Sequence, residues 1–332
     1  MANSELSWFA PFLVTLVFSA WPPSAEAQQQ PQGFAVERFY PAPPGSGWFV
    51  MDDLNMSGGL GGVVTFTSNY SRNPLDITSV DGAVHIPVVS NAEFINLGIA
   101  GTYDRYRVYF DFPMPLALRG TSGTLGAYQL SAPVLSPGTS PDNITDPRVG
   151  FNTRILGSPG SSLRLGAGAQ LIFPSGERSD YVSDGTYRGI FRLLAAGDRG
   201  RFSYAGFMGV HVRPLNDSPA PGSPNGDEFL FGSSVGRKFS FRRAWNGIVG
   251  PEIYGETSFS SFFSEQRTAV EGLLTTRFER TGSPLRFILG AGHGFVQHFG
   301  APEWRVLFGV ELVGQMSRRA DSSADPSTKV QN

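Results

Sequence analysis

The feature that most limits what this chain can fold into is a regular alternation of apolar and polar residues, clearest near its end. In EWRVLFGVELVG, residues 303–314, every second residue from Trp304 to Leu312 is large and apolar, and Arg305 and Glu311 occupy positions between them. Side chains of a β-strand alternate between two faces, so this pattern predicts a strand with one apolar and one charged face. A soluble sandwich would bury the apolar face, whereas a membrane barrel would turn it to lipid and enclose the charges.

Twelve segments with this alternation follow one another from Leu54 onward, and no stretch of useful length has the periodicity of an amphipathic helix. Several are 10–13 residues long, close to the roughly 9–11 residues that a tilted strand needs to cross a membrane. Their approximate spans are 58–70, 90–102, 105–116, 147–156, 162–174, 186–196, 201–213, 227–238, 247–258, 268–279, 284–297 and 303–313.

The connections between these segments alternate between short turns and longer polar loops. YDRY, GSPGSS, AGDRG and RTGSP are short, whereas PSGERSDYVSDGT and PLNDSPAPGSPNG are long and rich in proline, glycine and serine. Outer-membrane barrels have short periplasmic turns and long outer loops, and a Greek-key sandwich has no reason to sort its loops in this way. The sequence therefore predicts an all-β fold, a closed antiparallel up-and-down transmembrane β-barrel of about 12 strands.

The composition agrees with such a barrel. Charged residues make up 16 % of the chain, below the roughly 25 % of soluble domains. Mean hydropathy is only −0.11, and the chain lacks the run of about 20 apolar residues that a spanning helix needs. The net charge of −2 implies no nucleic-acid partner. The absence of cysteine excludes disulfides, iron–sulfur clusters and cysteine-ligated zinc.

Sorting the residues by face separates apolar side chains from charged ones. The apolar face includes Tyr106, Val108 and Phe110 on one segment and Val306 and Phe308 on another. A charge on the lipid face at mid-depth costs about 2–4 kcal/mol, so we expect the apolar face to meet lipid. The charged residues predicted to line the lumen are Arg107, Asp111, Arg148, Arg154, Arg164, Arg188, Arg192, Glu252, Glu256, Glu271, Arg277, Arg286, Arg305 and Glu311.

Two roles are open for these enclosed charges. They can form ion pairs that fill the barrel and fix its register, or they can form a polar constriction that selects small solutes by size and charge. Twelve strands lie between the filled eight-stranded and the open sixteen-stranded barrels. Glycines on the same face are expected to leave room for the long arginine and glutamate side chains; they are Gly166, Gly168, Gly290, Gly292 and Gly309.

Both ends of the chain differ from the barrel segment 54–314. Residues 1–27 resemble a secretory signal peptide, with an apolar run and the small-residue sequence AEA, although the charged Glu5 is atypical and a retained anchor is the alternative. Residues 28–53 are expected either to lie in the periplasm or to fold into the lumen as a plug. Residues 315–332 are expected to form a polar disordered tail.

Other clusters of polar residues carry weaker signals. In the loop RSDYVSDG, Asp180 and Asp184 lie near Glu177, but the spacing is not that of an EF-hand, and we expect solvated carboxylates there. A hydrolase would need a nucleophile beside a histidine, and His293 is the best-placed histidine, although strict alternation aims it at lipid. We therefore predict no catalytic residue, no metal site and no cofactor.

Several blocks occur in an order that resembles the transmembrane half of a group of OmpA-family outer-membrane barrels. They include GFAVERFYPAPPGSGWFVMDDL, DPRVGFNTRILG, VGPEIYGET and GAGHGFVQHFGAPEWRVLFGVEL. The resemblance implies a porin-like barrel in the outer membrane of a Gram-negative bacterium. Relatives often continue into a peptidoglycan-binding domain, whereas this sequence ends in a short polar tail, so that function is not carried over.

The sequence thus predicts an outer-membrane protein, not an enzyme, that is a structural barrel or a narrow passive pore for small solutes. Its expected partners are outer-membrane lipid and such solutes, and its oligomeric state is left open. The alternatives are a transporter for apolar or aromatic compounds, which would need an apolar pocket in the lumen, and an outer-membrane hydrolase.

Overall fold

The computed structural model describes residues 33–315, apart from 57, 134, 136–143, 221, 224, 242–243, 265–266 and 297–298. The predicted signal peptide 1–27 and the tail from residue 316 onward lie outside the described residues.

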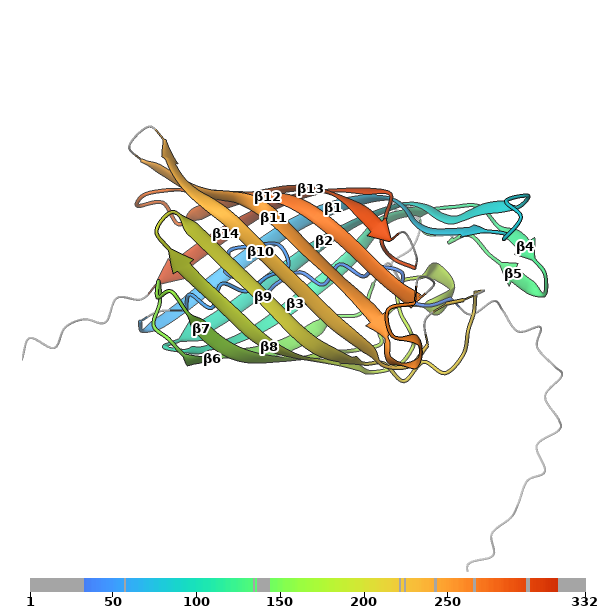
Figure 1. Cartoon of the computed structure of the whole chain (residues 1–332), viewed down its shortest axis with the longest axis horizontal. Helices are drawn as coiled ribbons and strands as arrows, with labels where there is room; N and C mark the ends of the chain where they lie inside the picture. The colour runs from blue at the N-terminus through green and yellow to red at the C-terminus, as the bar shows by residue number, and fades with distance from the viewer. Residues whose placement is uncertain are drawn as a thin grey trace, which may run out of the picture. The chain divides into compact units, whose positions relative to one another are not determined.

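Twelve long strands close into one antiparallel barrel (Figure 1). Their order around the wall is β1-β14-β13-β12-β11-β10-β9-β8-β7-β6-β3-β2, and a separate hairpin pairs β4 with β5. The barrel strands are β1 (Leu60–Thr78), β2 (His85–Tyr103), β3 (Tyr106–Arg119), β6 (Arg148–Leu156), β7 (Arg164–Ile172), β8 (Arg188–Arg199), β9 (Phe202–Val212), β10 (Glu228–Phe241), β11 (Trp245–Ser258), β12 (Thr268–Arg280), β13 (Leu285–Val296) and β14 (Trp304–Gln315). The hairpin strands are β4 (Gly123–Leu125) and β5 (Tyr128–Leu130).

The first and last strands complete the closure. β1 pairs with β14 from Gly61 opposite Gln315 to Arg72 opposite Trp304. A closed sheet has no free edge, so the backbone groups of the wall are hydrogen-bonded without water, as a lipid environment requires. The predicted fold class is confirmed, and each of the twelve alternating segments forms one strand.

The largest departure from the sequence prediction is at the first hairpin. Residues 71–89 were expected to be a loop, but β1 and β2 are 19 residues each and continue as a paired ribbon with register shifts near Leu75. Apolar side chains of this extension, such as Ile77 and Val88, pack with Leu118 and Leu130 in a buried cluster. Tertiary packing therefore extends the ribbon past the length that a membrane crossing needs.

The two faces of the wall are sorted as predicted. Phe110, Leu193 and Phe308 point outward and are 41 %, 63 % and 40 % exposed, while Arg107 and Arg305 on the opposite face are 2 % and 1 % exposed. The apolar face is therefore the outer face of the barrel, and the charged face is enclosed.

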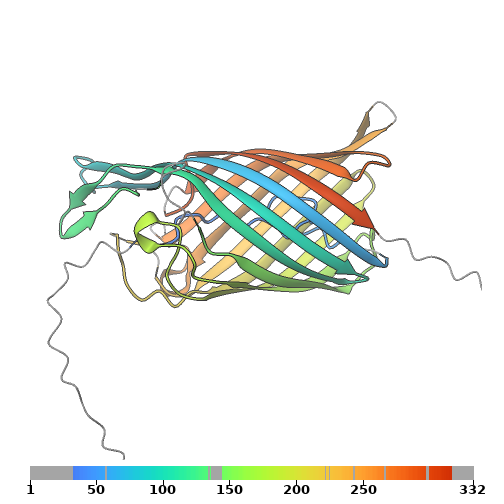
Figure 2. The same ribbon diagram turned by 180° about the vertical axis from the view of Figure 1, so that it is seen from behind.

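Residues 33–56, which we call the lumen segment, run inside the barrel from one end to the other (Figure 2). Phe34 packs against Tyr181 and Phe299 in the long connections, and the carbonyl of Leu54 accepts a hydrogen bond from Arg154 near a short turn. The segment thus enters at the end with the long loops and leaves at the end with the short turns, where β1 begins.

The described part of the chain includes two short 3-10 turns, η1 (Arg178–Asp180) and η2 (Phe259–Ser261). Among the described residues, no helix is long and apolar enough to cross a membrane.

Candidate functional site

The charged residues predicted to line the lumen all lie on the inner face of the wall. Arg192, Arg277 and Arg286 are half-buried there, and the others are less than a tenth exposed. Most of them contact the lumen segment, whose place in the barrel the sequence analysis had left open.

At the short-turn end, the wall holds two consecutive aspartates and the backbone beside them. Arg107 Nη1 donates to Asp52 Oδ2 at 2.7 Å, and Asn152 Nδ2 donates to the same oxygen at 2.6 Å. Arg164 Nε donates to the backbone carbonyl of Asp53 at 2.8 Å. Hydrogen bonds with an ionised partner are stronger than neutral ones, so these contacts fasten this end of the lumen segment.

Glu252 on β11 binds the middle of the lumen segment through its backbone. Its carboxylate accepts hydrogen bonds from the amides of Phe49, Val50 and Met51 at 3.0, 2.9 and 3.2 Å. The hydroxyl of Thr275 on β12 donates a fourth, at 2.7 Å. Burying a carboxylate without a cationic partner costs free energy. The four hydrogen-bond donors compensate for this cost.

Arg305 on β14 links the wall to the lumen segment nearer the long-loop end. Its Nε lies 2.8 Å from Glu271 Oε1 and its Nη1 2.9 Å from Glu37 Oε1, and Nη1 also donates to Asn69 at 2.9 Å. The guanidinium lies over the ring of Phe39, 5.1 Å from its centre. One arginine therefore joins two strands and the segment at a single point.

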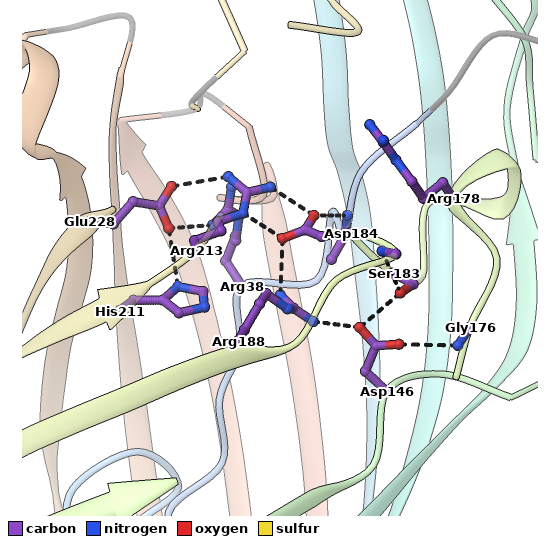
Figure 3. A network of polar contacts seen from close by, with 12 residues as sticks. Arg38, Asp146, Gly176, Arg178, Ser183, Asp184, Arg188, His211, Arg213 and Glu228 are labelled. Atoms are coloured by element: carbon purple, nitrogen blue, oxygen red, sulfur yellow. Dashed lines mark hydrogen bonds and ion pairs between the residues drawn. The ribbon is translucent and has the colours of Figure 1, made fainter. Parts of the chain in front are cut away.

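A larger set of charges, which we call the outer charge cluster, lies toward the long-loop end (Figure 3). It consists of Arg38, Asp146, Asp184, Arg188, His211, Arg213, Glu228 and Glu256.

Arg38 is the member of this cluster that comes from the lumen segment. Its Nη1 lies 2.8 Å from Glu228 Oε2 and 2.9 Å from Glu256 Oε1. His211 Nδ1 lies 3.1 Å from the same oxygen of Glu228. Within the described part of the chain, His211, Glu228 and Glu256 are the histidine and acidic residues grouped closely enough to hold a metal ion.

Asp184, in the connection from β7 to β8, corrects an expectation from the sequence. We expected a solvated carboxylate, but this side chain is 0 % exposed and accepts a hydrogen bond from the Ala35 amide at 2.8 Å. Burial opposes its ionisation, but Arg188 and Arg213 beside it outweigh that effect and hold the pKa of Asp184 well below its usual value. The expectation is therefore wrong at Asp184, which holds the lumen segment, whereas Glu177 is exposed as expected and Asp180 is half-buried.

The lumen also contains an apolar part that the sequence analysis did not predict. Phe39, Trp48, Phe49 and Leu54 of the lumen segment pack with inward-facing side chains such as Leu273. Further members on the wall are Leu194, Ile248, Tyr254, Ile288 and Leu307.

The inner-face glycines serve this apolar packing. A Cβ on Gly290 would lie 2.8 Å from the ring of Phe49, and one on Gly166 would lie 2.9 Å from Leu54. The expectation that these glycines make room for arginine and glutamate is thus wrong at these two positions, because the room is occupied by the lumen segment.

The three histidines that the structure describes differ in exposure. His293 points outward and is exposed, as alternation predicted, and His85 forms an exposed pair with Asp76 at 2.7 Å. His211 is fully buried, and the alternation of β9 with outward Met208 and Val212 could have placed it inside.

Comparison with known proteins supports the fold and goes no further. No family model and no curated protein matches the sequence. An outer membrane channel from Pseudomonas putida F1 is similar in structure, with a TM-score of 0.50 and 11 % identity over 77 % of this chain and 96 % of that one. LpxR from Salmonella typhimurium has a TM-score of 0.37 and 10 % identity, over 75 % of this chain and 99 % of that one. The β domain of the Bordetella autotransporter BrkA has a TM-score of 0.39 and 11 % identity, over 77 % of this chain and 99 % of that one. At 11 % identity the likeness to the Pseudomonas putida channel shows a shared barrel fold alone.

Proposed function

We propose that this chain is an outer-membrane β-barrel protein whose lumen is kept closed by residues 33–56, and that small solutes pass only when this segment moves. The observation that carries the proposal is the burial of the inner-face charges against the lumen segment.

An open aqueous pore would leave the charges on its wall hydrated. Here Arg164, Glu252 and Arg305 are 0 %, 0 % and 1 % exposed, and each has a partner in the lumen segment. Removing a charge from water costs several kcal/mol unless such partners replace the water. The charges therefore support a closed state, which refines the narrow passive pore expected from the sequence.

The proposed location follows from the outer face and the loops. An apolar band without charge is suited to lipid, and the asymmetry of long and short connections matches barrels with outer loops and periplasmic turns. The role is passive, without catalytic residue or cofactor, and the outward direction of His293 gives the hydrolase alternative no support. Membership of the OmpA family and the signal peptide stay predictions from the sequence.

A second candidate is a transporter for apolar compounds. It is favoured by the inward Leu194, Ile248 and Leu273, which pack on aromatic side chains of the lumen segment. If the segment leaves, this wall becomes an apolar patch in the lumen.

Conductance in planar bilayers tests the proposal. The full chain should show rare openings, and a variant without residues 33–53 should show a steady conductance. Heat-dependent gel mobility of both proteins controls for barrel folding. A steady conductance of the full chain that the deletion leaves unchanged would contradict the proposed closure. Liposome uptake of a charged and an apolar solute by the deletion variant distinguishes the pore from the transporter.

A further inference from the structure

We propose that His211, Glu228 and Glu256 form a binding site for a divalent transition-metal ion, which competes with Arg38 for the same position. The site itself does not depend on the proposed function, but its consequence for channel opening does.

The geometry already holds a cation between the two carboxylates. One nitrogen, Arg38 Nη1, lies 2.8 Å from Glu228 Oε2 and 2.9 Å from Glu256 Oε1. The ligand atoms of His211, Glu228 and Glu256 all lie within 4.8 Å of one another. The arginine nitrogen thus occupies the place where an ion bound to both carboxylates would lie.

Two of these residues also have a buried atom that could serve as a metal ligand and that makes no hydrogen bond. Glu256 Oε2 and His211 Nε2 are buried without a hydrogen-bond partner within the described part of the chain, and these residues are only 6 % and 0 % exposed. Native proteins rarely leave buried polar atoms unpaired. Arg38 and Glu256 also line a small cavity of about 30 Å³, which has room for about two water molecules.

The charge balance favours exchange of Arg38 for a doubly charged ion. The outer charge cluster joins four carboxylates to three arginines, which gives one net negative charge when all four carboxylates are ionised and His211 is neutral. If Arg38 leaves, four carboxylates face two arginines, and the two net negative charges match one divalent cation. Buried charges in proteins are paired with an opposite charge or coordinate a metal ion.

The ligand types select the ion. One imidazole nitrogen with two carboxylate oxygens suits Zn²⁺, which binds histidine and acidic residues in four-coordinate sites. Mg²⁺ and Ca²⁺ prefer oxygen ligands alone, so they should compete weakly. Water from the adjoining cavity supplies the fourth ligand.

Metal binding would remove only the Arg38 anchor of the lumen segment. Arg305 and Glu252 hold the segment through Glu37 and the amides of residues 49–51, and neither contact involves Arg38. We therefore expect Zn²⁺ to loosen the stretch around Arg38, which lies between these two anchors, and to raise the frequency of channel opening.

Calorimetric titration of the full chain in detergent with Zn²⁺ tests the site. The wild type should bind one ion, and Arg38→Met should bind it at least about 10-fold more tightly because the competing cation is gone. Glu256→Gln should bind Zn²⁺ about 10-fold or more weakly than the wild type, since mutation of residues outside the ligand set already changes metal affinity by about 10–100-fold. Arg305→Met is the matched control, because this arginine also links two carboxylates but has no histidine beside it.

Hydrogen exchange of residues 34–40 provides a second measurement, which should become faster with Zn²⁺ in the wild type and not in Glu256→Gln. Equal affinity in the wild type and Glu256→Gln would overturn the proposal, as would equal or weaker affinity in Arg38→Met. If Arg38→Met fails to fold, the wild type and Glu256→Gln decide. The titration involves no conductance, so its failure leaves the proposed closure intact, and a pore that stays open regardless leaves the metal site intact.

Discussion

Replacement of Glu252 by glutamine tests whether the lumen segment is held by its backbone. The two side chains have nearly the same shape, but glutamine has one acceptor oxygen and an NH₂ group in place of the second. In the protein, one oxygen of Glu252 accepts from Phe49 and Thr275, and the other accepts from Val50 and Met51.

The best arrangement of the glutamine turns its NH₂ group toward Thr275, whose hydroxyl can accept as well as donate. The Phe49 amide then loses its acceptor, and the bonds from Val50 and Met51 go to a neutral oxygen. A hydrogen bond to a charged group contributes about 1.5–3 kcal/mol and a neutral one about 0.5–1.5 kcal/mol. Glu252→Gln should therefore destabilise the seated segment by about 3 kcal/mol, roughly a 100-fold change in its equilibrium, at 1.4 kcal/mol per factor of ten.

Hydrogen exchange of the amides at 49–51 measures this change directly, and bilayer conductance measures its effect on opening. Exchange should become about 100-fold faster at these amides while the strands of the wall keep their protection. Glu279→Gln is the control, because Glu279 pairs with Arg286 of the wall at 2.5 Å. Unchanged exchange at 49–51 in a folded Glu252→Gln barrel would refute this account of how the segment is held.

Three further changes test other parts of the structure. Gly290→Ala should loosen the segment by about 1–3 kcal/mol and raise conductance, because its Cβ would lie 2.8 Å from the ring of Phe49, whereas Gly309→Ala, at 3.5 Å from that ring, should behave as wild type. Leu193→Arg should cost about 2–4 kcal/mol and reduce the folded barrel seen by heat-dependent gel mobility, since the side chain is 63 % exposed on the outer face; normal assembly would argue that this face does not meet lipid. The ionised form of Asp184 should stabilise the fold at pH values above its usual pKa of 3.8. That stabilisation should decrease as the pH falls below 3.8 toward the lower pKa of the folded state. The free energies of unfolding of the wild type and Asp184→Asn, measured in urea, should therefore differ most above about pH 4 and converge in acid.

The strands and the sorting of their faces were predictable because alternation is a local property of the sequence. Residues 303–313 show the pattern within one strand, and the direction of Arg305 follows from its neighbours alone. The partner of Arg305 in the lumen segment, Glu37, lies 268 positions away in the sequence, and no local pattern in 28–53 distinguishes a plug from a periplasmic extension. Gly290 leaves space on the inner face, but the sequence does not show that the ring of Phe49 from the lumen segment fills this space.

The mixture of charged and apolar contacts explains why the lumen segment should move as a unit over most of its length. Removing one partner of a buried ion pair costs about 3–5 kcal/mol, because the other charge stays buried and unpaired. Half-withdrawal of the segment would leave Arg107 without Asp52 and Arg305 without Glu37, so intermediate positions are unfavourable compared with a fully seated or fully released segment. The outer charge cluster differs under the proposed metal binding, in which another cation replaces Arg38 between Glu228 and Glu256. Release should therefore begin at the long-loop end, where exchange of one cation for another leaves no carboxylate unpaired.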